Sequence, residues 1–164
     1  MKIRLIILIS IVSFTIKAMG QVNDNFIRQQ VLKENIVDSL FVFGKWTIIG
    51  GTETHLKYLG QVMTSDGRIF KIMDSCWFWG LSHRATSRIL IFNGKNQYVG
   101  NYCLGMTNDL PDKLDNGILI FTNSDNEGCD KSVVTQVDLT KGLPKDFFLK
   151  CDEVNGDIYS FSTE

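Results

Sequence analysis

Four Asx-Gly dipeptides punctuate the chain, and they restrict its fold more than any other feature of the sequence. They are Asp66-Gly67, Asn93-Gly94, Asn116-Gly117 and Asn155-Gly156. Asn and Asp tolerate a left-handed backbone and glycine has no Cβ to clash, so these pairs are typical of tight turns between antiparallel strands. A chain with this punctuation is expected to fold as a succession of antiparallel strands.

Three of these dipeptides lie between apolar runs and therefore predict β-hairpins. The paired segments are 56–63 with 68–79, 88–92 with 97–104, and 147–151 with 157–162. Another strand is expected at 133–139, where apolar and polar residues alternate with the period of a half-buried strand. Further strands are expected at 118–122 and at 41–49, with Gly44 as a candidate bulge.

A helical pattern is confined to residues 24–35, where Asn23 or Asp24 is available as an N-cap. The fold class is therefore all-β: a small antiparallel β-sandwich or barrel of about eight to nine strands, with a short N-terminal helix. The sequence does not separate the sandwich from the barrel, because both alternate inward apolar residues with outward polar ones.

The first twenty residues have the pattern of a secretory signal peptide. Two basic residues precede an apolar run over residues 5–16, and Ala18-Met19-Gly20 follows. The run is too short for a membrane-spanning helix. We therefore expect residues 1–20 to be removed and residues 21–164 to form a single β-domain that is periplasmic or secreted.

The charge of the expected mature segment argues against several classes of partner. Three of the 17 basic residues lie in the leader, which leaves 14 against 18 acidic residues and a formal net charge of −4. Nucleic acid and anionic lipid are poor partners for such a surface. No later segment has the apolar length of a membrane span. A protein or a glycan remains as the expected partner, and the oligomeric state stays open.

All four cysteines lie in the expected mature segment, and an even number in an exported chain favours disulfides. The preferred pairing joins Cys76 to Cys103 and Cys129 to Cys151, because these pairs are nearest in sequence and are expected on neighbouring strands. The other connectivities, and free buried thiols, stay open as alternatives.

The segment of greatest functional interest surrounds two closely spaced tryptophans, Trp77 and Trp79. In a strand they point to the same side, with about 7 Å between them. Two coplanar indoles on a sheet surface could stack on a sugar ring or a flat ligand. His83, Arg84 and Arg88 follow and would supply donors for carboxylate or phosphate. The alternative is that the indoles belong to the core and the arginines cap the edge of the sheet.

No complete catalytic or metal-binding motif is present in the sequence. Ser82 adjoins His83, but the second glycine of a nucleophile elbow is missing. Neither His55 nor His83 belongs to a zinc-ligand spacing. Residues 123–128 imitate the start of a calcium loop, yet Val134 stands where a bidentate glutamate is required. We therefore expect neither a metal nor a cofactor.

These observations predict an exported binding or interaction module of the cell envelope or the secreted fraction rather than an enzyme. One alternative is a small hydrolase that acts on envelope glycan or peptide with a carboxylate or His83. Another is a structural or inhibitory envelope protein that works through a loop at 107–116 or 123–131. A deep cleft with perturbed carboxylates would favour the enzyme, and a flat aromatic patch would favour the binding module.

Overall fold

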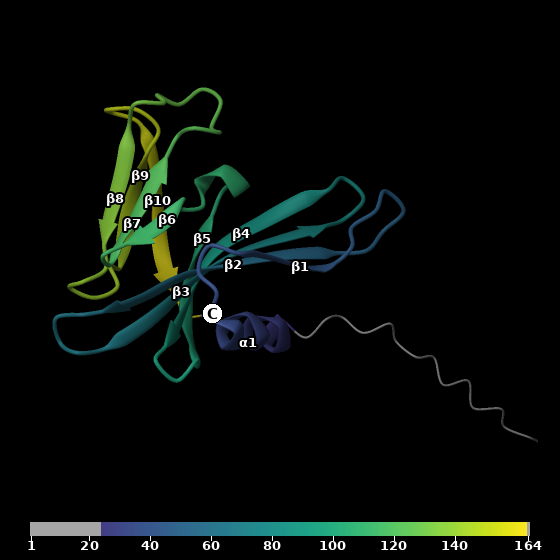
Figure 1. Cartoon of the computed structure of the whole chain (residues 1–164). Coiled ribbons are helices and arrows are strands. Elements are labelled where there is room, and N and C mark those ends of the chain that lie inside the picture. Colours follow the sequence, from purple (N-terminus) through teal and green to yellow (C-terminus); the bar gives the residue numbers. More distant parts are fainter. Residues whose placement is uncertain (1–23, 164) are drawn as a thin grey trace, which may run out of the picture.

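The computed structural model describes residues 24–163, and within this span the chain forms one α-helix, one short 3-10 helix and ten β-strands (Figure 1). The elements are α1 (Asp24–Glu34), β1 (Leu40–Gly44), β2 (Glu53–Met63), β3 (Ile69–Trp79), β4 (Arg84–Asn93), β5 (Tyr98–Leu104), η1 (Thr107–Asp109), β6 (Lys113–Asp115), β7 (Ile118–Thr122), β8 (Val134–Asp138), β9 (Asp146–Lys150) and β10 (Gly156–Ser162). No helix of this span has the length and apolar character that a membrane crossing needs. The expected leader, residues 1–20, lies outside the described residues.

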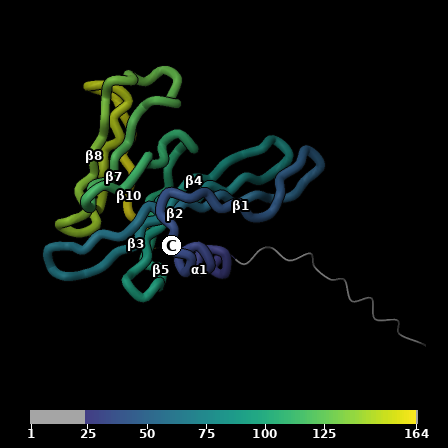
Figure 2. Tube along the Cα trace, viewed as in Figure 1, coloured from purple at the N-terminus to yellow at the C-terminus, as the bar shows by residue number. Residues whose placement is uncertain are grey.

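Within residues 24–163 the strands form a large sheet of seven and a small sheet of three, and all neighbours are antiparallel. The large sheet has the order β1-β2-β3-β4-β5-β10-β9, and the small sheet has the order β6-β7-β8. Figure 2 traces the chain through the first five strands into β6–β10, with β10 returning to lie beside β5. Neither sheet closes into a barrel, so the all-β prediction is confirmed in its sandwich form.

All four Asx-Gly dipeptides lie in or at the edge of connections between antiparallel strands, including Asn116-Gly117, for which no hairpin was expected. Of the four glycines in these dipeptides, Gly67 and Gly117 take the left-handed conformation that glycine favours, with φ of 82° and 81°. In the β4–β5 hairpin this role falls to Asn96, with φ of 62°. At position 156 glycine is required for a steric reason and not for its backbone conformation, because a Cβ at Gly156 would overlap the backbone of β9.

The buried side chains form one cluster between the two sheets and a second cluster between the large sheet and α1. The predicted helix is confirmed, and Ile27, Val31 and Leu32 turn toward the sheet. They pack in the second cluster with Leu56 and Met73. The helix therefore covers one face of the large sheet and leaves the opposite face to the small sheet.

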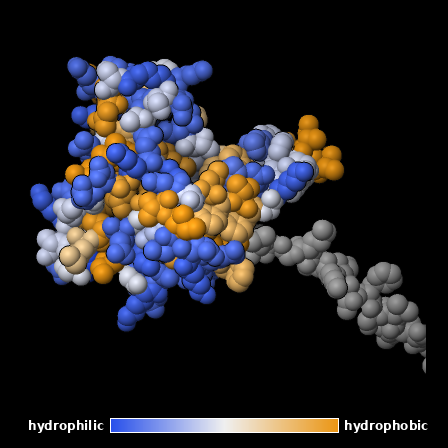
Figure 3. All heavy atoms as spheres, in the orientation of Figure 1, coloured by the Kyte–Doolittle hydropathy of each residue, from blue (hydrophilic) through white to orange (hydrophobic). Residues whose placement is uncertain are grey.

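The strand predicted at 41–49 ends early, at Gly44. This glycine is no bulge inside a strand: its φ of 77° turns the chain out of the extended conformation. The following residues form the tip of the β1–β2 hairpin, where Ile48 and Ile49 are 77% and 90% exposed. Figure 3 shows hydrophobic atoms at the end of this arm of the molecule.

Of the two predicted disulfides, the structure contains Cys129–Cys151 and leaves Cys76 and Cys103 as free thiols. The prediction for Cys76 and Cys103 is wrong because β4 lies between their strands, which separates them by roughly 10 Å. Cys76 lies opposite Ser87, whereas Cys103 lies opposite the next residue of β4, so the two thiols are on opposite faces of the sheet.

The Cys129–Cys151 disulfide joins the β7–β8 loop to the end of β9 across 22 residues of sequence. Closing a loop of this length stabilises a folded chain by about 3 kcal/mol in the chain-entropy model. We expect the double replacement Cys129→Ala and Cys151→Ala to lower the free energy of unfolding by this amount in urea denaturation. Cys103→Ala is the control, since this exposed free thiol should matter by less than about 0.5 kcal/mol. Equal stability of the double variant and the native protein would contradict the assignment.

Candidate functional site

Trp77 and Trp79 lie on the face of the large sheet that also carries α1, and they share one side of β3 as predicted. Their ring centroids are 5.5 Å apart with an interplanar angle of 21°, so the indoles stack on each other instead of forming one coplanar platform. The Trp79 indole N–H donates to Thr86 at 3.2 Å. Trp77 remains 37% exposed and Trp79 is half-buried.

The three other predicted binding residues are divided between the two faces of the sheet. Arg84 holds its guanidinium 5.5 Å from the Trp79 ring centroid, a cation–π contact. Arg88 is on the same face, opposite Ser75. His83 turns to the other face, where its ring stacks on Phe78 with 4.9 Å between centroids. The arginines thus join the tryptophans in what we call the aromatic face, and His83 does not.

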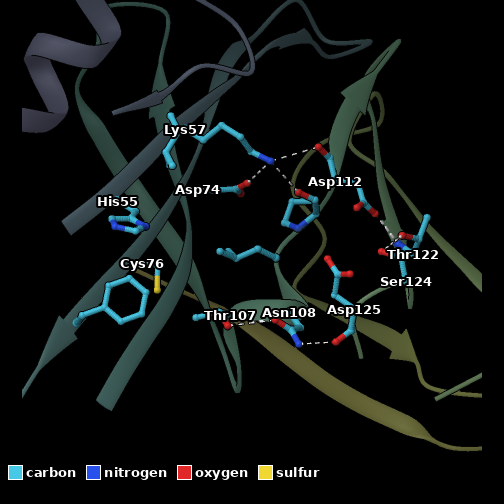
Figure 4. A pocket seen from close by; sticks show the side chains of 14 residues that line it. His55, Lys57, Asp74, Cys76, Thr107, Asn108, Asp112, Thr122, Ser124 and Asp125 are labelled. Atoms are coloured by element: carbon cyan, nitrogen blue, oxygen red, sulfur yellow. Dashed lines mark hydrogen bonds and ion pairs between the residues drawn. The ribbon is translucent and has the colours of Figure 1, made fainter. Parts of the chain in front are cut away.

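The opposite face of the large sheet borders a pocket of about 330 Å³, which we call the inter-sheet pocket (Figure 4). Its first wall is built by β1–β3, which supply Leu40, His55, Lys57, Asp74, Cys76 and Phe78. Its second wall comes from residues 107–112 around η1 and from the end of β7 with the loop that follows. The pocket therefore depends on segments that are far apart in sequence.

The register of β2 against β3 explains which side chains meet on the first wall. Lys57 lies directly opposite Asp74, and His55 lies directly opposite Cys76. Side chains opposite each other on antiparallel strands point to the same face, and alternate residues repeat this direction. Charged and thiol groups from two strands are thereby gathered beside the pocket.

Asp74 is the most perturbed group of the pocket. Its residue is 4% exposed, and neither carboxylate oxygen accepts a hydrogen bond from any residue in 24–163. The Lys57 ammonium is 3.3 Å from Oδ2, which makes an ion pair. Burial raises the pKa of Asp74 to about 7, against the opposing effect of Lys57. The carboxyl group is therefore balanced between its charged and neutral forms near neutral pH.

Lys57 connects the two walls of the pocket. Besides its ion pair with Asp74, its ammonium lies 3.4 Å from the carbonyl oxygen of Pro111 and 3.2 Å from that of Asp112. Lysine has three N–H donors, of which two go to these carbonyl oxygens, and the contact with Asp74 is an ion pair and not a hydrogen bond. The ammonium thus holds the segment before β6 against the large sheet.

The remaining titratable groups of the first wall do not form an activated nucleophile. His55 Nε2 is 2.6 Å from Oε1 of Glu53, and this hydrogen bond lowers the pKa of Glu53. The Cys76 thiol has Ser87 as its hydrogen-bond partner, at 3.9 Å, and burial raises the pKa of the thiol. A buried thiol with a raised pKa is a weak nucleophile at neutral pH.

The second wall is held by backbone and side-chain hydrogen bonds. The Asp112 carboxylate accepts the backbone N–H of Thr122 at 2.7 Å. Asn108 donates from its side-chain amide to the carbonyl oxygen of Asp125 at 2.7 Å. Figure 4 shows the carboxylates of Asp125 and Asp74 on opposite walls of the pocket.

The segment that imitates a calcium loop holds a lysine ammonium instead. Lys131 Nζ donates to the carbonyl oxygens of Asn123, Ser124 and Asn126 at 2.8 to 2.9 Å. A cation from the chain itself thereby occupies the ring of backbone oxygens. Within residues 24–163 no group of three His, Cys, Asp or Glu side chains is arranged to hold a metal ion.

No protein-family model, curated protein or solved structure matches the chain. The aromatic face was expected from the sequence, whereas the inter-sheet pocket was not. The sequence carried one signal for the pocket, namely that Lys57 and Asp74 lie on the two arms of the first predicted hairpin, and the bulge between Tyr58 and Gly60 brings them opposite each other.

We expect Asp74→Asn to change how stability depends on pH. The folded-state pKa of about 7 lies above the ordinary value of 3.8, so the folded protein keeps a proton that the unfolded chain has lost. Stability therefore falls as the pH rises from about 4 to 7, by up to roughly 4 kcal/mol. Urea denaturation across this range should show the decline in the native protein and its absence in Asp74→Asn. Parallel profiles for the two proteins would contradict the perturbed carboxyl group.

Proposed function

We propose that this protein is a binding module, not an enzyme, and that it takes up a small polar ligand in the inter-sheet pocket. One observation carries the proposal: the Asp74 carboxylate is buried beside the pocket, its ion pair with Lys57 is made at Oδ2, and neither oxygen accepts a hydrogen bond from any residue in 24–163. Buried polar groups in folded proteins nearly always have a partner. A ligand with hydrogen-bond donors would supply the missing one.

Binding is favoured over hydrolysis by the other groups of the pocket. The raised pKa of Asp74 is a property that general acids share. A hydrolase also needs an activated nucleophile or a base that holds water, and the buried, protonated thiol of Cys76 does not meet this need. His55 is held by Glu53, and Lys57 is held by Asp74 and two carbonyl oxygens.

We further propose that the binding module works outside the cytoplasm, in a periplasm or in the medium. The Cys129–Cys151 disulfide supports this location, because such bonds persist in oxidising compartments. The pattern of a cleavable leader at residues 1–20 points the same way.

The aromatic face is the second candidate binding site, for a glycan or a protein partner. The exposed part of Trp77 and the nearby guanidinium of Arg84 favour it. Against it, Trp79 has Trp77 stacked on its ring and Arg84 close to the same indole. Fewer aromatic surfaces are therefore left for a sugar ring than two side-by-side indoles would offer.

The test is a titration of the isotope-labelled protein with three compounds of one skeleton, namely 2-phenylethanol, 2-phenylethylamine and phenylacetate. We expect amide chemical shifts to change along the first wall of the pocket for at least one of them. Thr107→Trp should weaken this binding about tenfold or more, because the large ring intrudes from the second wall. Trp77→Ala, on the other face, is the matched control and should leave it unchanged.

Two outcomes would contradict the pocket as the binding site. One is the absence of shift changes with all three compounds. The other is a set of changes confined to the surroundings of Trp77 and Trp79, which would select the aromatic face instead.

A further inference from the structure

We infer that the ligand of the inter-sheet pocket is a small organic cation, a protonated amine with an apolar body. This inference rests on the proposed function and names the chemical class that the pocket selects. It follows from the charges on the two walls, the contacts of Lys57 and the apolar part of the lining.

The carboxylates around the pocket outnumber its free cations. Asp74 and Asp125 lie on opposite walls of the pocket. Asp112, in the segment 107–112 of the second wall, adds a third carboxylate. Lys57 is the one lysine or arginine among the residues that line the pocket in the described part of the chain. Because the Lys57 charge is paired with Asp74, Asp112 and Asp125 repel an anionic ligand and attract a cation.

Lys57 is already engaged by three groups of the two walls. Its ammonium donates to the carbonyl oxygens of Pro111 and Asp112 and forms an ion pair with Asp74. An arriving acceptor would have to displace one of these contacts. An arriving cation displaces none of them and is attracted by the Asp74 carboxylate, whose buried oxygens accept no hydrogen bond from the described residues.

The rest of the lining requires an apolar body attached to the charged group. Leu40, Phe78, Leu110 and Pro111 line the pocket together with the carboxylates. A volume of about 330 Å³ is at the lower end of small-molecule pockets, so the ligand is small. The Phe78 ring also offers a surface on which a cation is attracted.

Binding of a cation is coupled to the loss of a proton from Asp74. The charged groups that act on this carboxyl are Lys57 from β2, which lowers its pKa, and Asp38 before β1 and Asp112 before β6, which raise it. A bound ammonium favours the ionised carboxyl, so at a pH below about 7 binding must first remove a proton. The affinity for a cation should therefore fall as the pH falls, and the affinity for an uncharged ligand should not.

The experiment compares the affinities of 2-phenylethylamine, 2-phenylethanol and phenylacetate by calorimetry and chemical-shift titration. We expect the amine to bind at least about tenfold more tightly than the alcohol, the usual effect of a charge-assisted hydrogen bond, and phenylacetate to bind most weakly. Amine affinity should fall about fivefold to tenfold from pH 7.5 to pH 6, whereas alcohol affinity stays constant.

Two substitutions test which carboxylates of the pocket cause the preference for the amine. Asp74→Asn keeps the shape of the side chain and should abolish both the preference for the amine and its pH dependence. Asp125→Asn, on the exposed second wall, should weaken amine binding several-fold and gives an answer even if the first variant folds poorly. Asp157→Asn is the matched control, because this exposed aspartate on β10 is not among the residues that line the pocket.

The outcomes separate this inference from the proposed function. If the alcohol or phenylacetate binds in the pocket as tightly as the amine, the inference that the ligand is a cation is wrong. The pocket then remains the binding site. A preference that survives in both pocket variants also overturns it. If none of the three compounds binds, both the inference and the proposed function fail.

Discussion

The register of β2 against β3 is the constraint on which the rest of the structure depends. It aligns Lys57 with Asp74 on one face and leaves Trp77 on the other. A slip of one residue would exchange the two faces and place charged side chains against α1. The turn at Asp66-Gly67 and the bulge between Tyr58 and Gly60 fix this register. The two cores, the pocket and the aromatic face all follow from it.

The local part of this fold could be predicted because turn chemistry acts over a few residues. The hairpins at Asp66-Gly67, Asn93-Gly94 and Asn155-Gly156 are where the sequence placed them. Strand order is different, because it depends on contacts between distant segments. The insertion of β4 between the strands of Cys76 and Cys103 separates two thiols that are close in sequence. The prediction of disulfides from proximity in sequence was therefore correct for Cys129–Cys151 and wrong for Cys76 with Cys103.

The same distinction explains why the sequence indicated the aromatic face and missed the pocket. Trp77 and Trp79 are two residues apart, so the alternation along one strand is enough to place them together. The pocket needs Asp74 from β3, residues 107–112, and the loop after β7. No periodicity in the chain encodes that the small sheet lies over this end of β2 and β3.

Other buried polar side chains of the protein have hydrogen-bond partners, and Asp74 differs from them in this respect. Buried Asp109 accepts from the Tyr159 hydroxyl and the Met106 N–H, and buried Asn123 donates to three carbonyl oxygens. Among the residues that the structure describes, Asp74 holds the only buried side-chain oxygens without a hydrogen bond. An asparagine of the same shape would avoid the cost of burying a charge at neutral pH. The Asp74 carboxyl lowers stability and borders the inter-sheet pocket. Its presence is therefore better explained by a role in ligand binding than by a role in stabilising the fold.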